Sequence, residues 1–230
     1  MNFQLNLDTL FNPKGIAVIG ASTHPGKFGF VALHNILAAG FDGNIFATNP
    51  MTPEILGVQT LESVKSIPAN SIDVAMICLG PEQTIAVLPE LAEKGVKAGF
   101  VVSGGFRESG FEGIELEKEL VEVANSLEIT IAGPNGQGFV STPANLCSQI
   151  VSPYPPLGNI SIASQSGNIL SAMLNQARAR NIGIARAISI GNQAQVDIAE
   201  YIRYFGKDPE TKVIVSYVCL LYTSDAADDL

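Results

Sequence analysis

Short apolar segments alternate with longer amphipathic ones along most of the chain, and this alternation limits the possible folds most. The apolar segments are nearly continuous and rich in β-branched residues, as parallel strands buried on both faces usually are. They lie at 15–20, 43–49, 73–79, 98–103 and 128–133. Helical patterns separate them at 27–39, near 60–66, at 82–95 and at 111–127. The sequence therefore predicts an α/β domain with a Rossmann-like, doubly wound parallel sheet.

The helical pattern at 111–127 also predicts which side of that helix is buried. Its apolar residues recur at helical spacing along one side. They are Ile114, Leu116, Leu120, Val123 and Leu127.

The pattern restarts after a Pro/Gly-rich break at 152–159. Strands are predicted at 159–164, 184–191 and 212–218, with helices at 167–181 and 196–208. We place a domain boundary near 146–157. The first domain is expected to cover 1–146, and 157–218 is expected to begin a second, incomplete α/β domain.

The last residues, 219–230, differ from everything before them. "CLLYTSDAADDL" is small, polar and acidic, and it follows a strand without a helix start or a partner strand. A disordered acidic terminus is one interpretation. We favour translated read-through of a sequencing adapter, which makes 219–230 a non-native tail and cuts the native chain near Val218.

The net charge limits the possible binding partners, and the cysteines indicate the cellular compartment. The net charge is −9, with only 13 Lys and Arg, which argues against nucleic acid or an anionic membrane as partner. Cys78, Cys147 and Cys219 form no CxxC pair, as is common in reduced, cytoplasmic proteins. No apolar run has the roughly 18 residues of a membrane span. The first residues lack the features of a signal peptide.

The loop after the first strand is the strongest candidate for a ligand site. "IGASTHPGKFG" places small residues where backbone can approach a phosphate, at the carboxyl edge of the sheet. Its glycines, Gly20, Gly26 and Gly29, do not have the G-x-G-x-x-G spacing of dinucleotide sites. The longer loop and Lys27 favour a bulkier, more anionic ligand than NAD. A tight turn without ligand is the alternative.

Further loops of small residues follow the other predicted strands. They are "TNP" at 48–50, "LGPEQT" at 79–84, "VSGGF" at 102–106 and "GPNGQGF" at 133–139. Asn49 stands near the place where many dinucleotide enzymes carry an acid for the ribose, which weakens an NAD interpretation. Because these loops end successive strands, we expect them to form one extended pocket.

In the second unit, "ASQSGNIL" follows a strand and opens a helix. Ser164, Gln165, Ser166 and Gly167 offer hydroxyl and N–H groups where the helix dipole favours an anion. An ordinary serine N-cap explains the same residues, so the pattern leaves both interpretations open.

"GASTHPGKFG", "TNP", "EILG", "VSGGF" and "GPNGQGF", in this order, resemble the CoA-binding domain of the NDP-forming acyl-CoA synthetase family. That family includes ADP-forming acetate–CoA ligases and the succinyl-CoA ligase alpha subunit. "IASQSGNIL" and "SIGNQAQVDIAEYIRYFGKDPETKVIVSYV" resemble the start of its flavodoxin-like ligase domain. The resemblance covers about residues 1–218.

The resemblance implies CoA as ligand, together with a small acyl group. It implies that the nucleotide end of CoA meets the opening loop and that the other strand ends line the rest. The CoA residues carried over are Gly20, Ala21, Ser22, Thr23, His24, Pro25, Gly26, Lys27, Asn49, Pro50, Gly80, Pro81, Ser103, Gly104 and Asn135. It further implies that the second loop holds a phosphate, with Ser164, Gln165, Ser166 and Gly167, beside Gly191 and Asn192.

The sequence departs from the family at two of these loops. Met51 and Thr52 follow "NP", where many members have a lysine for the CoA phosphates. Gly136 replaces a cysteine that the chemistry does not need.

The family reaction converts acyl-CoA, phosphate and NDP into acid, CoA and NTP through a phosphohistidine. This chain has two histidines, His24 and His34, and neither matches that residue. Cys219 stands where the family has an orienting glutamate. We therefore predict no catalytic residue and no metal site in this chain. We expect NDP, NTP and Mg²⁺ to bind a missing ATP-grasp domain or beta subunit, and this chain to be inactive as a ligase.

Two other functions compete with this interpretation. The chain could be a stand-alone CoA-binding regulatory module, although such a module would stop near 145. It could also be an NAD(P)-dependent oxidoreductase on the same fold, and the missing acid after the second strand disfavours that.

Overall fold

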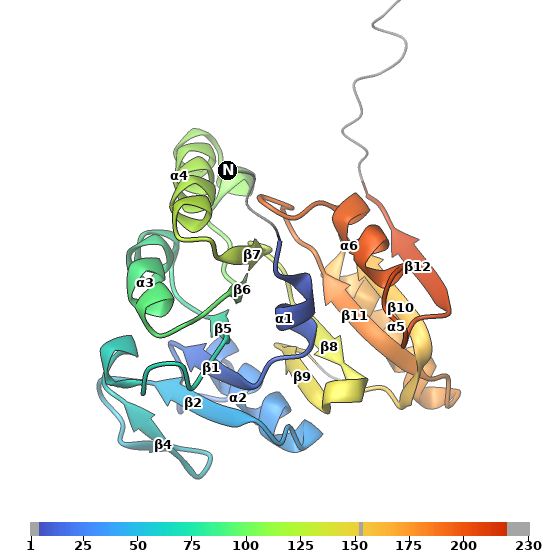
Figure 1. Cartoon of the computed structure of the whole chain (residues 1–230), viewed down its shortest axis with the longest axis horizontal. Helices are drawn as coiled ribbons and strands as arrows, with labels where there is room; N and C mark the ends of the chain where they lie inside the picture. Colours follow the sequence, from blue (N-terminus) through green and yellow to red (C-terminus); the bar gives the residue numbers. More distant parts are fainter. Residues whose placement is uncertain (1–4, 152–153, 220–230) are drawn as a thin grey trace, which may run out of the picture.

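The computed structural model describes residues 5–151 and 154–219, so the predicted tail lies outside the described residues except for Cys219. Within these residues the chain forms two sheets that lie side by side, each with its own helices (Figure 1).

The first sheet has seven strands in the order β3-β4-β2-β1-β5-β6-β7, and only β3 runs antiparallel to its neighbour. Because the chain moves outward from β1 in one direction and then returns to its other side at β5, the strand order reverses between β1 and β5. The strands are β1 (Gly15–Ile19), β2 (Asn44–Thr48), β3 (Glu54–Ile55), β4 (Val58–Leu61), β5 (Val74–Ile77), β6 (Ala98–Val101) and β7 (Thr130–Ala132). This is the doubly wound, Rossmann-like order that the sequence predicts.

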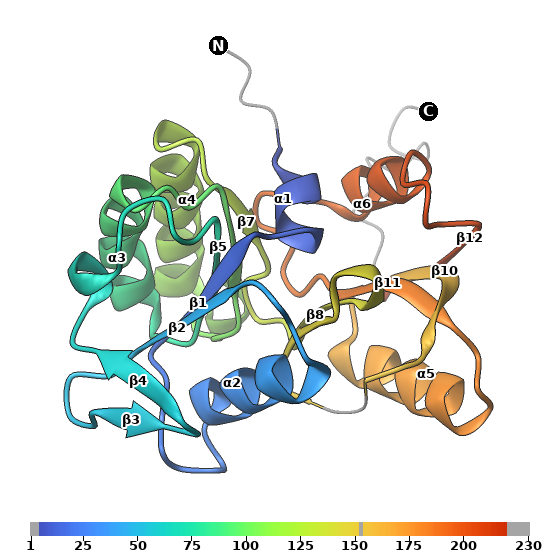
Figure 2. The ribbon, with the colours of Figure 1, turned by 60° about the horizontal axis from the view of Figure 1, so that its bottom comes forward.

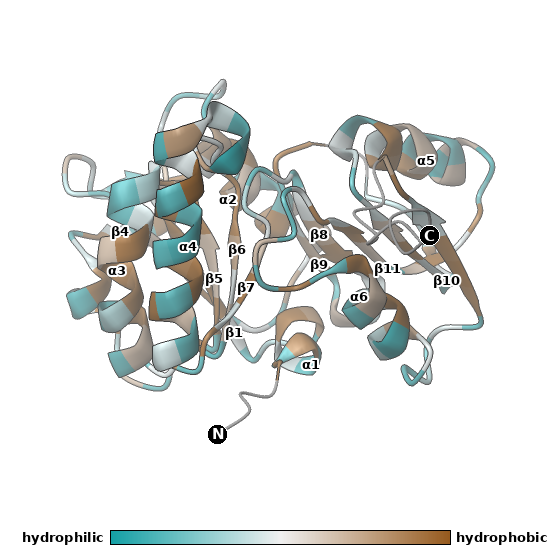
Figure 3. Cartoon of the chain, turned by 90° about the horizontal axis from the view of Figure 1, so that it is seen from above, coloured by the Kyte–Doolittle hydropathy of each residue, from teal (hydrophilic) through white to brown (hydrophobic). Residues whose placement is uncertain are grey.

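Helices cover both faces of this sheet (Figure 2). Alternate residues of β1 point to opposite faces: Ile16 and Val18 join the core that contains α2, whereas Ala17 and Ile19 join the core that contains α3 and α4. The helices are α1 (Leu7–Phe11), α2 (Phe28–Ala39), α3 (Pro81–Glu93) and α4 (Phe111–Ser126). In Figure 3 the strands between these layers are mostly hydrophobic, and α3 and α4 carry polar residues between hydrophobic ones.

The prediction of a helix near 60–66 was wrong. Residues Val58–Leu61 form strand β4, and only Val64–Ser66 form a short 3₁₀ helix, η1. Leu56 and Gly57 both have positive φ, 52° and 82°, which makes a tight hairpin turn that returns the chain from β3 into β4. The other 3₁₀ helices are η2 (Arg107–Ser109) and η3 (Thr142–Ala144).

The second sheet has five strands in the order β12-β10-β11-β8-β9. Its strands are β8 (Gly138–Ser141), β9 (Leu146–Gln149), β10 (Leu157–Ser164), β11 (Ile184–Ser189) and β12 (Val213–Tyr217), with α5 (Gly167–Ala179) and α6 (Ile198–Phe205). β10 is parallel to β11 and β12, whereas β8 pairs antiparallel with β11 and β9. The three strands and two helices expected after 157 are all present, with ends that differ by a few residues.

The hairpin β8–β9 was not predicted. β8 precedes the expected boundary near 146–157 and β9 lies at the start of it, yet both strands belong to the second sheet because β8 bonds to β11 and to β9. By hydrogen bonding, the two sheets divide between Ala132 and Gly138, earlier than the predicted boundary.

The buried face of α4 is largely the expected one, because Leu120 is fully buried and Leu116, Val123 and Leu127 pack partly buried against the same core. It departs from the expectation at two positions. Glu117 is buried, whereas Ile114 is 40% exposed. Glu117 is buried because it pairs with Arg107 and accepts a hydrogen bond from Asn192, partners that no local periodicity reveals.

We call the first sheet with α2, α3 and α4 the first unit, the second sheet with α5 and α6 the second unit, and the contact between them the junction. Helix α1 lies between the two units (Figure 1). Phe11 packs edge-on against Phe139 and stacks on Tyr204, with ring centroids 5.8 and 5.3 Å away. Beneath it, the buried Arg186 pairs with Asp208 at 3.2 Å and donates to the backbone carbonyl of Phe11. One core, containing residues of both units, therefore runs across the junction.

Candidate functional site

The carboxyl ends of the parallel strands of the first sheet lie at one edge, and the reversal between β1 and β5 falls there. In open α/β sheets ligands bind outside this edge at such a reversal. The loops that leave it are 20–27, 49–53, 78–80, 102–106 and 133–137. They contain every predicted CoA residue except Pro81, which is the first residue of α3.

The opening loop is shaped by glycine at two positions. Gly20 has φ of 84°, and a Cβ there would lie 2.9 Å from the carbonyl oxygen of Cys78. Gly29, in the first turn of α2, lies so close to the loop that a Cβ would be 2.1 Å from the carbonyl oxygen of Gly20. The start of α2 is thereby held against the loop, as a phosphate site at a helix N-terminus requires.

His24 organises this loop. Its ring Nδ1 accepts from the backbone N–H of Gly26 at 3.0 Å, and the backbone N–H of His24 donates to the Ser22 hydroxyl at 3.1 Å. Lys27 is the N-cap residue of α2, and no side-chain hydrogen bond caps that helix. Residues 23–27 and Phe28, the first residue of α2, are exposed, so the Lys27 side chain lies in solvent beside the start of that helix. This arrangement suits an anionic ligand.

Asn49 braces the loops through both ends of its amide. Its Nδ2 donates to the carbonyl oxygen of Ala21 at 2.8 Å, and its Oδ1 accepts from the N–H groups of Met51 and Thr52. The side chain therefore fixes the opening loop relative to the turn after β2, and Pro50 beside it is exposed.

The remaining loops of the edge contact one another in sequence. A Cβ at Gly105 would lie 2.8 Å from Pro81, and the N–H of Asn135 donates to the carbonyl oxygen of Ser103 at 3.0 Å. Gly80, Gly104 and Asn135 are exposed along this line. The predicted CoA residues thus form one continuous edge.

Among the described loops of this edge, the cysteine is Cys78, and its thiol is buried. Cys78 follows β5, and burial raises the pKa of its thiol to about 12. The pKa of the Cys147 thiol in β9 is likewise raised to about 12, by burial against a weaker opposing hydrogen bond from Gln149. His34 lies on the exposed side of α2, stacked on Phe30 with ring centroids 6.4 Å apart.

The predicted phosphate loop leads from β10 into α5. The Ser166 hydroxyl accepts from the N–H of Ile169 at 3.3 Å, so Ser166 caps the helix. The fully buried Ser164 hydroxyl donates to the carbonyl oxygen of Ser166 at 2.7 Å, which makes Ser164 a brace beneath the loop. Gln165 bonds to the end of β12 through the carbonyl oxygen of Tyr217 and the N–H of Cys219.

The loop after β11 lies against the loop after β7. Asn192 donates its N–H to the carbonyl oxygen of Pro134 at 2.9 Å, and a Cβ at Gly191 would lie 2.1 Å from the same oxygen. The side chains of Asn135 and Asn192 are also bonded, at 3.2 Å. We call the predicted CoA-binding residues the CoA set and the predicted phosphate-binding residues the phosphate set. The two sets therefore meet at Asn135.

A cavity of about 490 Å³ lies where the sets meet. It is lined by Gly104 and Asn135 of the CoA set and by Ser166 and Gly167 of the phosphate set. Sequence reasoning missed several of its other lining residues. They are Phe28, Val102, Gln137, Ile150, Asn168 and Ser189.

Gln137 is the clearest of these missed residues. Its Nε2 donates to Asn168 at 3.2 Å and its Oε1 accepts from Ser171 at 2.7 Å, so it ties the loop after β7 to the start of α5. It lies inside the quoted motif "GPNGQGF", and that position was the available signal.

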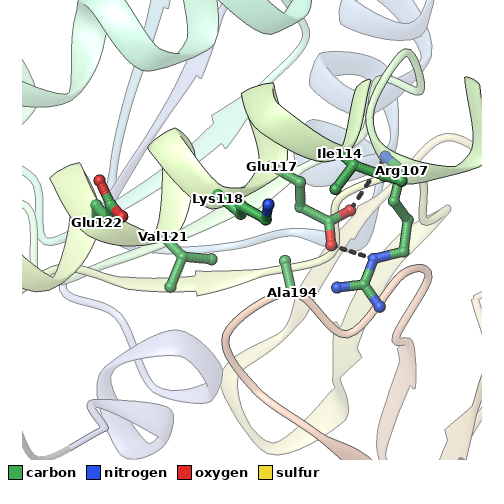
Figure 4. Close-up of a pocket in the computed structure, with 7 residues that line it drawn as sticks. All are labelled: Arg107, Ile114, Glu117, Lys118, Val121, Glu122 and Ala194. Carbon is green, nitrogen blue, oxygen red and sulfur yellow. Dashed lines mark hydrogen bonds and ion pairs between the residues drawn. The ribbon is translucent and has the colours of Figure 1, made fainter. Parts of the chain in front are cut away.

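Two further cavities are lined by residues of both units. One, of about 330 Å³, is lined by the phosphate-set residues Gln165, Gly191 and Asn192, together with Glu108 and Arg107. The other, of about 510 Å³, lies between α4 and Ala194 and is lined by the Arg107–Glu117 pair (Figure 4). None of the predicted site residues lines the cavity of about 510 Å³. We therefore place the candidate site at the cavities of about 490 and 330 Å³.

The chain belongs to the CoA-binding domain family, whose model matches residues 14–142. Residues 157–219 match the succinyl-CoA ligase like flavodoxin domain. Both families agree with the resemblance seen in the sequence.

The relatives are ADP-forming acyl-CoA ligases. The chain is 36% identical to acetate–CoA ligase [ADP-forming] I of Archaeoglobus fulgidus, over 92% of this chain and 30% of that protein. It is 38% identical to acetate–CoA ligase [ADP-forming] II subunit alpha of Pyrococcus furiosus, over 92% and 46%. It superposes with a TM-score of 0.89 on acetyl-coenzyme A synthetase 1 of Ca. Korarchaeum cryptofilum in complex with phosphate and ADP, with 36% identity over 95% of this chain and 47% of that one.

The chain thus spans less than half the length of these relatives. Across the described residues, no helix is both long and apolar enough to cross a membrane.

Proposed function

We propose that this chain is the CoA- and phosphate-binding N-terminal part of an NDP-forming acyl-CoA ligase. The observation that carries the proposal is the meeting of two loop sets at one cavity, where Gly104 and Asn135 face Ser166 and Gly167. The edge of the first sheet would hold the nucleotide end of CoA, with Lys27 on its phosphates. The pantetheine arm and a small acyl group would then run toward the cavity.

The start of α5 would hold the phosphate that attacks the acyl group. Backbone N–H groups and the dipole of this 13-residue helix favour an anion there, beside the loop 191–192. The full reaction would convert acyl-CoA, phosphate and NDP into acid, CoA and NTP through a phosphohistidine. That histidine, NDP and Mg²⁺ would lie on an ATP-grasp domain or beta subunit. The protein would act in the cytoplasm, and the free cysteines of the described residues support a reducing compartment.

Calorimetric titration of the 230-residue chain with CoA, and separately with NAD, tests the first half of the proposal. We expect CoA to bind more tightly, and tighter binding of NAD would favour an oxidoreductase domain instead. Lys27→Ala should weaken CoA binding by about 1–3 kcal/mol, the range for a lost charged hydrogen bond. The matched control is Lys97→Ala, because Lys97 is exposed just before β6, at the opposite edge of the sheet.

Inorganic phosphate, followed by ³¹P line broadening, tests the second half. A ligase part should bind phosphate, whereas a stand-alone CoA module should bind CoA alone. We further expect no ATP from this chain with acetyl-CoA, phosphate and ADP. Turnover that a point mutation in this chain abolishes would place the phosphoryl chemistry within it.

A further inference from the structure

A polar cluster joins the first unit to the loop after β11. Asn192 Nδ2 donates to Glu108 Oε2 at 2.5 Å and to Glu117 Oε2 at 2.9 Å. Glu108 belongs to η2 and Glu117 to α4 of the first unit, whereas Asn192 belongs to the second. The contacts span 84 and 75 residues of sequence, so they are tertiary links between the units.

The two carboxylates determine which way the Asn192 amide points. Carboxylates only accept hydrogen bonds, so the NH₂ group must face them and Oδ1 must face away. Oδ1 then accepts from Asn135 Nδ2 at 3.2 Å. Reversing the amide would place its oxygen against both carboxylates and its NH₂ against that of Asn135.

The other oxygen of Glu108 holds the loop after β6. Oε1 accepts from the N–H of Gly105 at 2.6 Å and from that of Phe106 at 3.3 Å. Gly104 lies so close that a Cβ there would be 2.7 Å from the same oxygen. One carboxylate thus contacts the loop of the CoA set with one oxygen and the loop of the phosphate set with the other.

The ionised form of Glu108 suits this double contact. Partial burial would raise the pKa of Glu108, but the hydrogen bonds from Asn192 and from the N–H groups of Gly105 and Phe106 outweigh it and lower the pKa. Glu117, behind it, is held by its ion pair with Arg107 (Figure 4). The carboxylate pair therefore presents acceptors, and no donor, to Asn192.

We propose that Glu108 is a positioning residue that couples the loop 102–106 of the CoA set to the loop 191–192 of the phosphate set. When a ligand moves the loop 102–106, Glu108 transmits the movement to Asn192, and a ligand at the loop 191–192 acts in reverse. The inference rests on the proposed function, because it concerns two ligand sites whose occupants are CoA and phosphate.

Glu108→Gln is the sharpest variant. The glutamine oxygen can still accept from Gly105, but its NH₂ group then faces the NH₂ group of Asn192. Glu117 prevents Asn192 from turning over in response. The substitution therefore breaks the link between the loops. Because Glu108 also lines the cavity of about 330 Å³, the individual affinities are expected to change as well, and the ratio between them is the readout. Glu112→Gln, at an exposed position at the start of α4, makes the same change of charge and is the control.

The experiment measures CoA affinity of the 230-residue chain with and without saturating inorganic phosphate, and phosphate affinity with and without CoA. By thermodynamic reciprocity the two ratios are equal, and a coupled pair of sites typically gives about 5-fold or more. We expect such a ratio for the wild type and for Glu112→Gln. For Glu108→Gln we expect a ratio within about twofold of one, with each ligand still bound.

Amide spectra of ¹⁵N-labelled protein give a second readout. Phosphate alone should shift the N–H signals of Gly105 and Phe106 in the wild type and leave them in place in Glu108→Gln. A folded Glu108→Gln protein that keeps the wild-type ratio and shifts overturns the inference, as does a wild type that binds both ligands with a ratio of one. A wild type that binds neither CoA nor phosphate would instead refute the proposed function.

Discussion

The two sheets of this protein are covered to very different extents. In the first, β1, β5 and β6 are buried along their whole length between helices on both faces. In the second, only β11 is buried throughout among the parallel strands, and the edge strand β12 has no fully buried residue. An open apolar groove of about 480 Å³ lies beside α5 and is lined by residues such as Ile162, Met173 and Val215.

The second sheet obtains much of its cover from the first unit and from α1. Its hairpin strand β9 packs against α2, and Phe205 and Tyr204 of α6 pack on Phe11 of α1. One core spans both units, a second lies under α3 and α4 in the first unit, and a smaller third lies between α5 and the second sheet. Because its own core is smaller, we expect the second unit to depend more on the junction than the first.

Among the substitutions that test this difference, Arg186→Ala should cause the largest loss of stability. The substitution leaves Asp208 buried without its ion-pair partner, and removes a hydrogen bond to Phe11 of α1. Breaking a buried pair in this way costs about 3–5 kcal/mol of unfolding free energy. Urea unfolding measures the loss.

All five tyrosines of the chain follow residue 153, so tyrosine fluorescence reports the second unit and circular dichroism reports both. In Arg186→Ala we expect the fluorescence transition at lower urea than the dichroism transition. The control is Arg203→Ala, which breaks an exposed pair with Glu200 and should cost less than about 1 kcal/mol. Coincident transitions in Arg186→Ala would show that the two units unfold as one.

Gly29→Ala probes the first unit by itself. The added methyl would meet the backbone of Gly20 and Ala21, which cannot move aside as a flexible side chain could. We expect a loss of about 1–3 kcal/mol from overpacking, together with weaker CoA binding. Gly80→Ala adds the same methyl in open space and should change stability by less than about 0.5 kcal/mol. An unaffected Gly29→Ala protein would mean that α2 can shift freely from the loop.

Hydrogen exchange compares the strands directly. Among the described residues β12 pairs only with β10, so its outer N–H groups lie at an edge, whereas β5 and β11 have neighbours on both sides. We expect the amides of β12 to exchange at least about tenfold faster than those of β5 and β11, which is ~1.4 kcal/mol of opening free energy. Equal protection of β12 would show that its edge is covered in solution.

Local patterns sufficed to predict most of this fold. The runs of β1, β5 and β6 identify themselves by continuous apolar residues, and their parallel arrangement brings the following loops to one edge. The hairpin β8–β9 was missed because its strands are short and its partner β11 lies far along the chain. For β3 and β4 the only local sign was the Leu56-Gly57 turn.

The candidate site divides in the same way. Motifs indicated the loops of both sets, but not which side chains brace them: Asn49 and Ser164 have polar atoms engaged with backbone. Glu108 and Gln137 were missed because their contribution depends on contacts across the junction. The burial of Glu117 could not be read from helical spacing, since its partners Arg107 and Asn192 come from other elements.

The smallest effect we expect is a pH dependence at the junction itself. Hydrogen bonds from Asn192, Gly105 and Phe106 outweigh partial burial and place the folded-state pKa of Glu108 below its unfolded value of about 4.3. A depressed pKa stabilises the folded protein fully above the unfolded value, and the contribution is lost as pH falls through the folded value. Glu108→Gln should therefore be less stable than wild type at pH 7, with the difference shrinking below about pH 4.3. Urea unfolding of both proteins from pH 7 to pH 3 measures this, with Glu112→Gln as the control for loss of one charge. A difference that stays constant, or grows, as the pH falls would mean that the ionised carboxylate does not stabilise the junction between the two units.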